Sequence, residues 1–125
     1  MPNHKKKILI IEDEAMISLM YCTEFARNGY IILTADNGIK GLEMAVKEKP
    51  DIIVLDIVMP ELDGFSVLEK LRVNKTTKDI PVIILTVLGG EENRLRGEKL
   101  GAVEYIVKSD FTPAQIYKII KKYVG

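Results

Sequence analysis

Acidic side chains follow directly after two of the most apolar segments of the chain. Glu12 and Asp13 come after the apolar run 8–11, and Asp56 comes after the apolar run 52–55. Carboxylates held within a few ångströms of one another repel, which raises their pKa values or draws in a cation. Mg²⁺ is bound in proteins by a few carboxylate oxygens and keeps several of its waters. If the fold brings the two segments together, these residues predict a magnesium site.

A hydroxyl group and an ammonium group follow two further apolar segments. Thr86 comes after the run 82–85, and Lys108 comes after the run 103–107. Taken singly, such a threonine is most often a capping residue and such a lysine a surface residue. Next to a metal-bound carboxylate, however, both would bind the oxygens of a phosphoryl group on Asp56. Together, the side chains predict phosphoryl chemistry on an aspartate.

Short apolar runs are the elements that must position these residues. Four of them are continuous: 8–11, 31–33, 52–55 and 82–85. Each is too short for a helix, and none alternates with polar residues, so we expect strands of a parallel sheet covered on both faces. The fifth run, 103–107, contains the charged residue Glu104 and is expected at a sheet edge.

Stretches with the apolar spacing of helices lie between and after these runs. They end near Gly29, Pro50, Asn74 and Gly101, and a last helix begins with the capping box Thr112-Pro-Ala-Gln115. The alternation predicts an α/β fold of the doubly wound, flavodoxin-like (βα)₅ type, with a five-stranded parallel sheet in the order 2-1-3-4-5. Ligands bind such sheets outside the carboxyl ends of the strands where the order reverses, here between the first and third strands.

Composition bounds the class of protein. A chain of 125 residues with 47% hydrophobic residues supports one domain, with an ordered core expected at 7–124 and a polar tail at 1–6. The 18 basic and 18 acidic residues give zero net charge, which disfavours direct binding to nucleic acid or to an anionic membrane. The only cysteine, Cys22, to which we assign no role, and the only histidine, His4, disfavour disulfides, zinc sites and histidine-based catalysis. With no apolar run long enough to cross a bilayer, a cytoplasmic protein is expected.

The sequence resembles the receiver domain of two-component response regulators, in particular the single-domain chemotaxis regulators. The resemblance runs over 7–124 and is carried by Ile-Leu-Ile-Ile-Glu-Asp-Glu at 8–14, Asp-Ile-Val-Met-Pro-Glu-Leu-Asp-Gly at 56–64, Leu-Thr at 85–86, Leu-Gly-Ala at 100–102 and Tyr-Ile-Val-Lys at 105–108. It implies that Asp56 is the phosphoacceptor. It also implies the remaining site residues: Glu12, Asp13, Asp56 and the Val58 backbone carbonyl for Mg²⁺, Thr86 and Lys108 for the phosphoryl oxygens, and Thr86 with Tyr105 as the switch pair.

The same resemblance implies a phosphorylation-dependent signalling switch and not an enzyme. The phosphoryl donor would be a histidine kinase or a phosphotransfer protein. Because 125 residues leave no room for an effector domain beside the receiver, we expect the signal to pass by protein contact. The face built from the fourth helix, the fifth strand and the fifth helix is the surface that partners of receivers meet.

Two positions depart from the usual receiver pattern. Val87 stands where a small residue is common, and Val58 and Leu88 beside it are also apolar. With no polar side chain to position an attacking water, we expect slow loss of the phosphoryl group and restricted access for bulky donors. Ser109 stands where the family most often has proline after a cis bond. Because a cis bond before a non-proline residue costs about 3 to 4 kcal/mol, we expect a trans Lys108–Ser109 bond and a reshaped loop.

Two other classes of protein would use the same residues differently. A phosphatase with an aspartyl-phosphate intermediate usually has a second aspartate two residues after the nucleophile, where this chain has Val58. A flavodoxin-like binding module that is never phosphorylated would need a Ser-, Thr- or Gly-rich loop after the first strand to bind flavin, whereas the acids at 12–14 repel phosphate. Turnover of a phosphate ester would indicate the first class, and a bound flavin the second.

Overall fold

The computed structural model describes residues 5–124, so the prediction for His4 and most of the expected tail lie outside it. The elements are β1 (Lys7–Ile11), α1 (Ala15–Ala26), β2 (Ile31–Ala35), α2 (Gly38–Glu48), β3 (Ile52–Leu55), α3 (Gly64–Val73), β4 (Val82–Thr86), α4 (Glu91–Lys99), β5 (Glu104–Val107), a 3₁₀ helix (Lys108–Asp110) and α5 (Pro113–Val124). The strands form one parallel sheet in the order β2-β1-β3-β4-β5, which confirms the predicted fold class and strand order.

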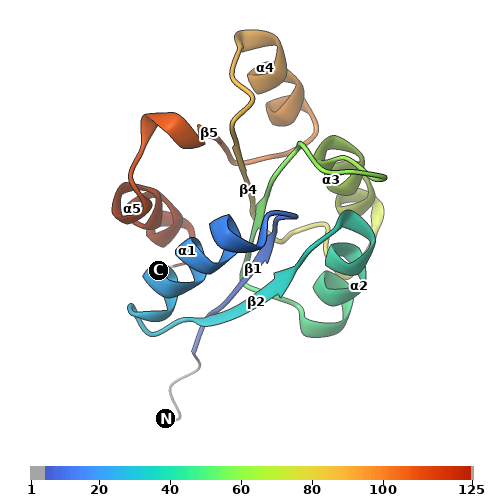
Figure 1. The fold of residues 1–125 in the computed structure, drawn as a ribbon. Helices are drawn as coiled ribbons and strands as arrows, with labels where there is room; N and C mark the ends of the chain where they lie inside the picture. Colours follow the sequence, from blue (N-terminus) through green and yellow to red (C-terminus); the bar gives the residue numbers. More distant parts are fainter. Residues whose placement is uncertain (1–4, 125) are drawn as a thin grey trace.

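Helices cover both faces of the sheet (Figure 1). Alternate residues of each strand enter two separate cores, because successive side chains of a strand point to opposite faces. Leu9 and Ile11 of β1 pack in the core on the side of α2 and α3, whereas Ile8 and Ile10 pack in the core on the side of α1 and α5. The sheet therefore lies between two apolar cores, one on each face.

The burial of the strands shows where the sequence prediction was right and where it was wrong. Every residue of β3 and β4 is buried, as expected for strands covered on both faces. The same prediction is wrong for β2, where Ile31 is 40% exposed and Thr34 is exposed. The reason is that β2 pairs only with β1 and has no strand on its other side within residues 5–124. The prediction that β5 lies at an edge is confirmed.

The helix ends follow the capping signals, but α4 packs less than its apolar residues suggested. The Thr112 hydroxyl accepts a hydrogen bond from the Gln115 amide, and the Gln115 side chain accepts one from the Thr112 amide, which confirms the capping box. In α4 only Gly97 is buried, and Leu95 is 49% exposed. A Cβ atom at Gly97 would lie 2.7 Å from the Ile84 side chain, so this glycine sets how closely α4 approaches the sheet.

No helix within residues 5–124 has both the length and the apolar character required to span a membrane.

Candidate functional site

The carboxyl ends of the strands meet at one edge of the sheet, and the predicted side chains lie there. Glu12 directly follows β1, Asp56 directly follows β3, Thr86 ends β4, and Lys108 directly follows β5. The Asp56 amide donates to the Ile11 carbonyl at 3.0 Å, so β3 stays paired with β1 as far as the acidic residues. Parallel pairing with no slip in register thus places four residues from four strands in one site.

Lys108 joins the two buried carboxylates of the site. Its ammonium group donates to Glu12 Oε1 at 2.5 Å and to Asp56 Oδ2 at 3.1 Å, and all three side chains are nearly buried. Burial opposes the charged form of Lys108, but its contacts with Glu12 and Asp56 outweigh that effect and raise its pKa. Burial also raises the pKa of Glu12, although bonds from Lys108 and the Glu14 amide act against it.

The acidic cluster has the composition that a divalent cation requires. Glu12, Asp13 and Asp56 each offer a carboxylate oxygen, and these oxygens lie within 4.8 Å of one another. The donors are all oxygen atoms, which is the ligand type that Mg²⁺ takes. Lys108 supplies one positive charge to three acids, and a divalent cation would offset the remaining negative charge. On both grounds the residues fit Mg²⁺.

The backbone after β3 is shaped around Asp56. The Val58 amide donates to Asp56 Oδ1 at 3.1 Å and orients that carboxylate. Gly64 begins α3 directly against this segment, because an added Cβ atom would lie 2.3 Å from the Asp56 carbonyl oxygen. Asp63 caps the helix by accepting from the Ser66 amide at 2.9 Å. The loop 57–63 therefore returns close to the acceptor and fixes its position.

The two residues implied as a switch are linked through one backbone segment. The Thr86 side chain is fully buried, and its hydroxyl accepts a hydrogen bond from the Leu88 amide at 3.3 Å. The Tyr105 hydroxyl donates to the Leu88 carbonyl at 2.5 Å. The Leu88 backbone therefore links the Thr86 hydroxyl to the Tyr105 hydroxyl.

The rim of the site is apolar, as the sequence indicated. Val58 and Val87 are 51% and 64% exposed, and Leu88 is also exposed. No cis peptide bond occurs within residues 5–124, so the Lys108–Ser109 bond is trans, as predicted. After it the chain forms the 3₁₀ helix Lys108–Asp110 and not the extended turn that a cis-proline gives. How long a phosphoryl group survives at this rim stays a prediction.

Sequence reasoning missed one residue that supports the site from a distance. Arg72, in the last turn of α3, donates to the backbone carbonyls of Lys78, Ile80 and Gly101 at 3.1, 2.9 and 2.9 Å. It thereby ties the end of α3 to the start of β4 and to the turn before β5. The sequence offers only a weak signal for this role, because a basic residue near a helix C-terminus is common on solvated surfaces.

The fold and the site together define a class: a doubly wound α/β domain whose buried aspartate lies beside two further acids and a lysine, at the sheet edge where a threonine ends β4. The sequence model described as the response regulator receiver domain matches residues 8–121. The chain therefore belongs to the response regulator receiver domain family.

Solved structures of similar fold come from the same family. Chemotaxis response regulator CheY4 of Vibrio cholerae has a TM-score of 0.88 and 28% sequence identity, covering 96% of this chain and 99% of that one. The receiver domain of the Francisella response regulator 1452 has a TM-score of 0.87 and 32% identity, covering 96% of this chain and 97% of that one.

Curated relatives are longer than this chain. A probable transcriptional regulator, ycf27, of Guillardia theta is 40% identical over 112 residues, which are 90% of this chain and 42% of the relative. The alkaline phosphatase synthesis transcriptional regulatory protein PhoP of Bacillus subtilis is 38% identical over 116 residues, 93% of this chain and 47% of the relative. The chain thus spans less than half the length of the curated relatives it matches.

Proposed function

We propose that this receiver domain is a phosphorylation-dependent switch in which Asp56 accepts a phosphoryl group with the help of Mg²⁺. The observation that carries the proposal is the convergence of Glu12, Asp13 and Asp56 with Lys108 at the carboxyl ends of the strands. A buried aspartate held by an ammonium group on one side and by the Val58 amide on the other is ordered for in-line attack.

The transfer step uses the site residues and the donor, with a proton from solvent and Mg²⁺ bound at the acidic cluster. A carboxylate oxygen of Asp56 attacks the phosphorus of a phosphohistidine, the nitrogen–phosphorus bond breaks, and the released imidazole takes a proton from water. Bound Mg²⁺ would neutralise charge between the acceptor and the incoming phosphoryl group. Lys108 stays within reach of Asp56 and would bind a phosphoryl oxygen, and the Thr86 hydroxyl would bind another.

The added charge gives the switch its driving force. A phosphoryl group carries about −1.5 to −2 charges at neutral pH, so it draws Lys108 and the Thr86 hydroxyl toward Asp56. A shift of Thr86 strains its bond with the Leu88 amide, and Leu88 also holds Tyr105. The equilibrium between two arrangements of Tyr105 and α4 then moves, which is a population shift and not a new fold.

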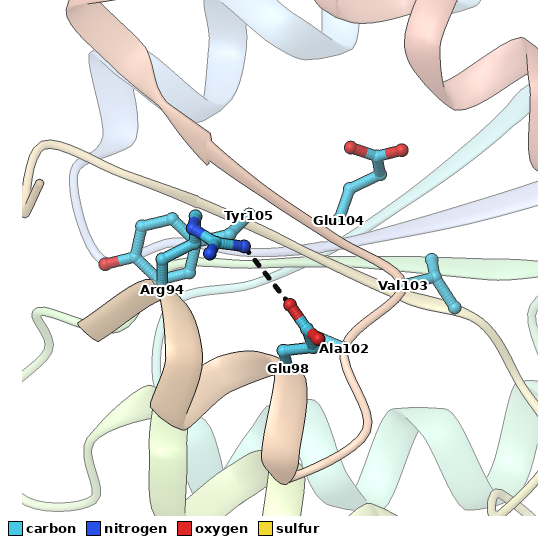
Figure 2. Close-up of a pocket in the computed structure, with 6 residues that line it drawn as sticks. All are labelled: Arg94, Glu98, Ala102, Val103, Glu104 and Tyr105. Carbon is cyan, nitrogen blue, oxygen red and sulfur yellow. Dashed lines mark hydrogen bonds and ion pairs between the residues drawn. The ribbon is translucent and has the colours of Figure 1, made fainter. Parts of the chain in front are cut away.

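The surface that would report this shift is the α4–β5–α5 face. It contains a hollow of about 210 Å³, which is lined by residues of α4, of β5 and of the turn between them. Figure 2 draws the residues that line it, Tyr105 among them. Arg94 bonds Glu98 across one turn of α4, and both residues line this hollow together with Tyr105. A downstream protein binding here would sense the position of Tyr105, and a histidine kinase or phosphotransfer protein would bind at the acidic edge.

The phosphatase alternative is less well supported. The second aspartate that such enzymes use as an acid or base would stand at Val58, which is apolar and half exposed. We therefore propose a phosphoacceptor that takes part in its own phosphorylation and dephosphorylation but has no separate substrate.

Intact mass spectrometry tests the proposal. With Mg²⁺ and phosphoramidate, a compact nitrogen–phosphorus donor, the mass of the protein should rise by one phosphoryl group. The mass should not rise in the Asp56→Asn variant or when EDTA is added. Asp51→Asn, an exposed acid at the opposite end of the sheet, serves as the matched control and should react like the natural sequence. An unchanged mass with the natural sequence, or an increase that Asp56→Asn retains, would overturn the proposal.

A further inference from the structure

The free edge of β2 has features that the phosphorylation switch does not use. Within residues 5–124 this strand pairs only with β1. The segment 30–35 carries no charged residue and no proline, which are the residues that natural sheets use to block further pairing at an edge. Its exposed side chains include Ile31, so the edge is apolar as well as open.

The backbone groups on this edge belong to Ile32 and Thr34. The Ile31 amide donates to the Lys6 carbonyl and the Ala35 carbonyl accepts from the Glu12 amide, so both residues point toward β1. Successive residues of a strand direct their N–H and C=O groups to opposite sides, so those of Ile32 and Thr34 point away from the sheet. Two donors and two acceptors are thus aligned for pairing with another strand.

Two helices flank this edge, one on each face, and each leaves a shallow groove beside β2. The groove on the α1 face, of about 270 Å³, is lined by Ala15 and Leu19 of the helix, and Leu19 is exposed. The groove on the α2 face, of about 440 Å³, is lined by Lys40, Glu43 and Lys47. The border on the α1 face is mixed, because Glu12, Ser18 and Asp36 also line that groove, and the border on the α2 face carries charges of alternating sign.

We propose that β2 pairs in antiparallel orientation with β2 of a second copy of this chain, joining the two sheets into one. Ile32 of each copy would exchange two hydrogen bonds with Thr34 of the other. A two-fold axis through Leu33 perpendicular to the sheet generates this arrangement, and it brings α1 against α1 and α2 against α2, each pair antiparallel.

The charges on α2 favour a second copy over an unrelated partner. Glu43 and Lys47 lie one turn apart, are both exposed, and have opposite signs. When two identical helices run antiparallel across a two-fold axis, Glu43 of one copy faces Lys47 of the other and the reverse contact repeats it. The α2 surface is therefore complementary in charge to the same surface of a second copy, as the interface of a two-fold symmetric dimer requires. The phosphoacceptor sites then point to opposite ends of the assembly, and both stay open.

Sedimentation velocity over a range of protein concentrations tests the pairing. We expect a reversible dimer that Lys47→Glu and Glu43→Lys each weaken at least tenfold, because each places like charges opposite one another where residue 43 of one copy faces residue 47 of the other. Mixing the two single variants, or combining both substitutions in one chain, should restore the dimer. Lys118→Glu, an equal charge change on α5, is the control and should leave association unchanged.

Amide hydrogen exchange supplies a readout of the backbone pairing. Exchange at Ile32 and Thr34 should slow as the protein concentration rises, while exchange at exposed amides of α5 should not. Two results would overturn the proposal: a chain that stays monomeric at every concentration, or a dimer that the α2 variants do not weaken. Neither result bears on phosphorylation of Asp56, which is measured separately by mass.

Discussion

Lys108 is the residue on which the charge balance of the site depends. Its ammonium group contacts Glu12 and Asp56, whose carboxylates would otherwise face each other in a buried position. The same contacts that stabilise the site without metal would oppose metal binding, because Lys108 and a cation would compete for the Glu12 and Asp56 carboxylates. Under the proposed function, the lysine would limit how tightly Mg²⁺ binds before phosphorylation and would bind a phosphoryl oxygen afterwards.

Lys108→Met should make the stability of the domain depend more strongly on Mg²⁺. Removing the ammonium group leaves like charges close together, so the free energy of unfolding should fall by about 2 kcal/mol without metal. Mg²⁺ should then restore more stability to the variant than it adds to the natural sequence, since ligand binding to the folded state stabilises by mass action. Urea denaturation with and without Mg²⁺ measures both effects. Lys118→Met should change neither, and an equal loss at all Mg²⁺ concentrations in Lys108→Met would contradict the competition.

Val87 is expected to control the lifetime of the aspartyl phosphate. It is 64% exposed at the rim, and together with Val58 it leaves no polar side chain to orient an attacking water. Val87→Ala should speed the loss of the phosphoryl group several-fold, and Val58→Asn should speed it further by binding the water. Decay of phosphorylated protein, followed by intact mass, gives the rates. Val73→Ala, at the far end of α3, provides the control, and a lifetime of seconds that Val87→Ala leaves unchanged would show that the rim does not control it.

Among the elements, α3 is joined to the neighbouring strands through a single arginine. Arg72→Met should lower the free energy of unfolding by about 2 to 3 kcal/mol, because three backbone carbonyls lose a charged donor. Arg72→Lys should recover only part of this loss, since one ammonium group does not reach all three carbonyls. Arg27→Met, which changes an exposed arginine at the end of α1, is the comparison for urea denaturation. Equal stability of Arg72→Met and Arg27→Met would exclude the proposed role of Arg72.

The last helix is attached to β5 by a bond that depends on pH. The Tyr123 hydroxyl donates to the Glu104 carboxylate, and this bond raises the pKa of Tyr123 to about 12. Because the pKa is raised on folding, the bond stabilises the fold below pH 10, and its contribution is lost as pH rises toward 12. Tyr123→Phe should cost about 1 kcal/mol at pH 7, a difference that shrinks above pH 10.

Absorbance of the tyrosinate group checks the same assignment directly. Tyr30 also has its pKa raised to about 12, by burial and by its contact with Tyr117. In the folded protein Tyr30 and Tyr123 should therefore titrate near pH 12, and Tyr123→Phe should remove one group from the titration near pH 12. If Tyr123→Phe removes a group that titrates near pH 10, the bond to Glu104 does not persist in solution.

For the molecule as a whole, the sequence predicted the strands, the helices and their order, because these features depend on residue patterns within short segments. Continuous apolar runs predicted β1, β3 and β4, because a strand covered on both faces has no polar side. The same pattern in 31–33 predicted the strand but not its exposure. The exposure arises because β2 lies at the edge of the sheet, and the segment's own residues do not show that. The contacts of Arg72 were not predictable, because they join backbone carbonyls far apart in the sequence.

The site was predicted more completely than the surfaces around it. The positions of Glu12, Asp56 and Lys108 at one edge of the sheet were predictable from the sequence. Each residue follows an apolar run, and the carboxyl ends of parallel strands lie at the same edge. The ion pairs among these residues were not predictable, because whether Lys108 contacts Glu12 or only Asp56 depends on side-chain conformations. Zero net charge likewise gave no indication of the acidic cluster at one edge of the sheet.

The central claim is that Asp56 accepts the phosphoryl group, and chemical trapping tests it most directly. After incubation with phosphoramidate and Mg²⁺, borohydride reduces an aspartyl phosphate to homoserine, and peptide mass spectrometry locates the product. We expect reduction at Asp56 alone, and none when EDTA removes the metal. Reduction at Asp13 or at any other acid, or none at Asp56 in the presence of Mg²⁺, would contradict it.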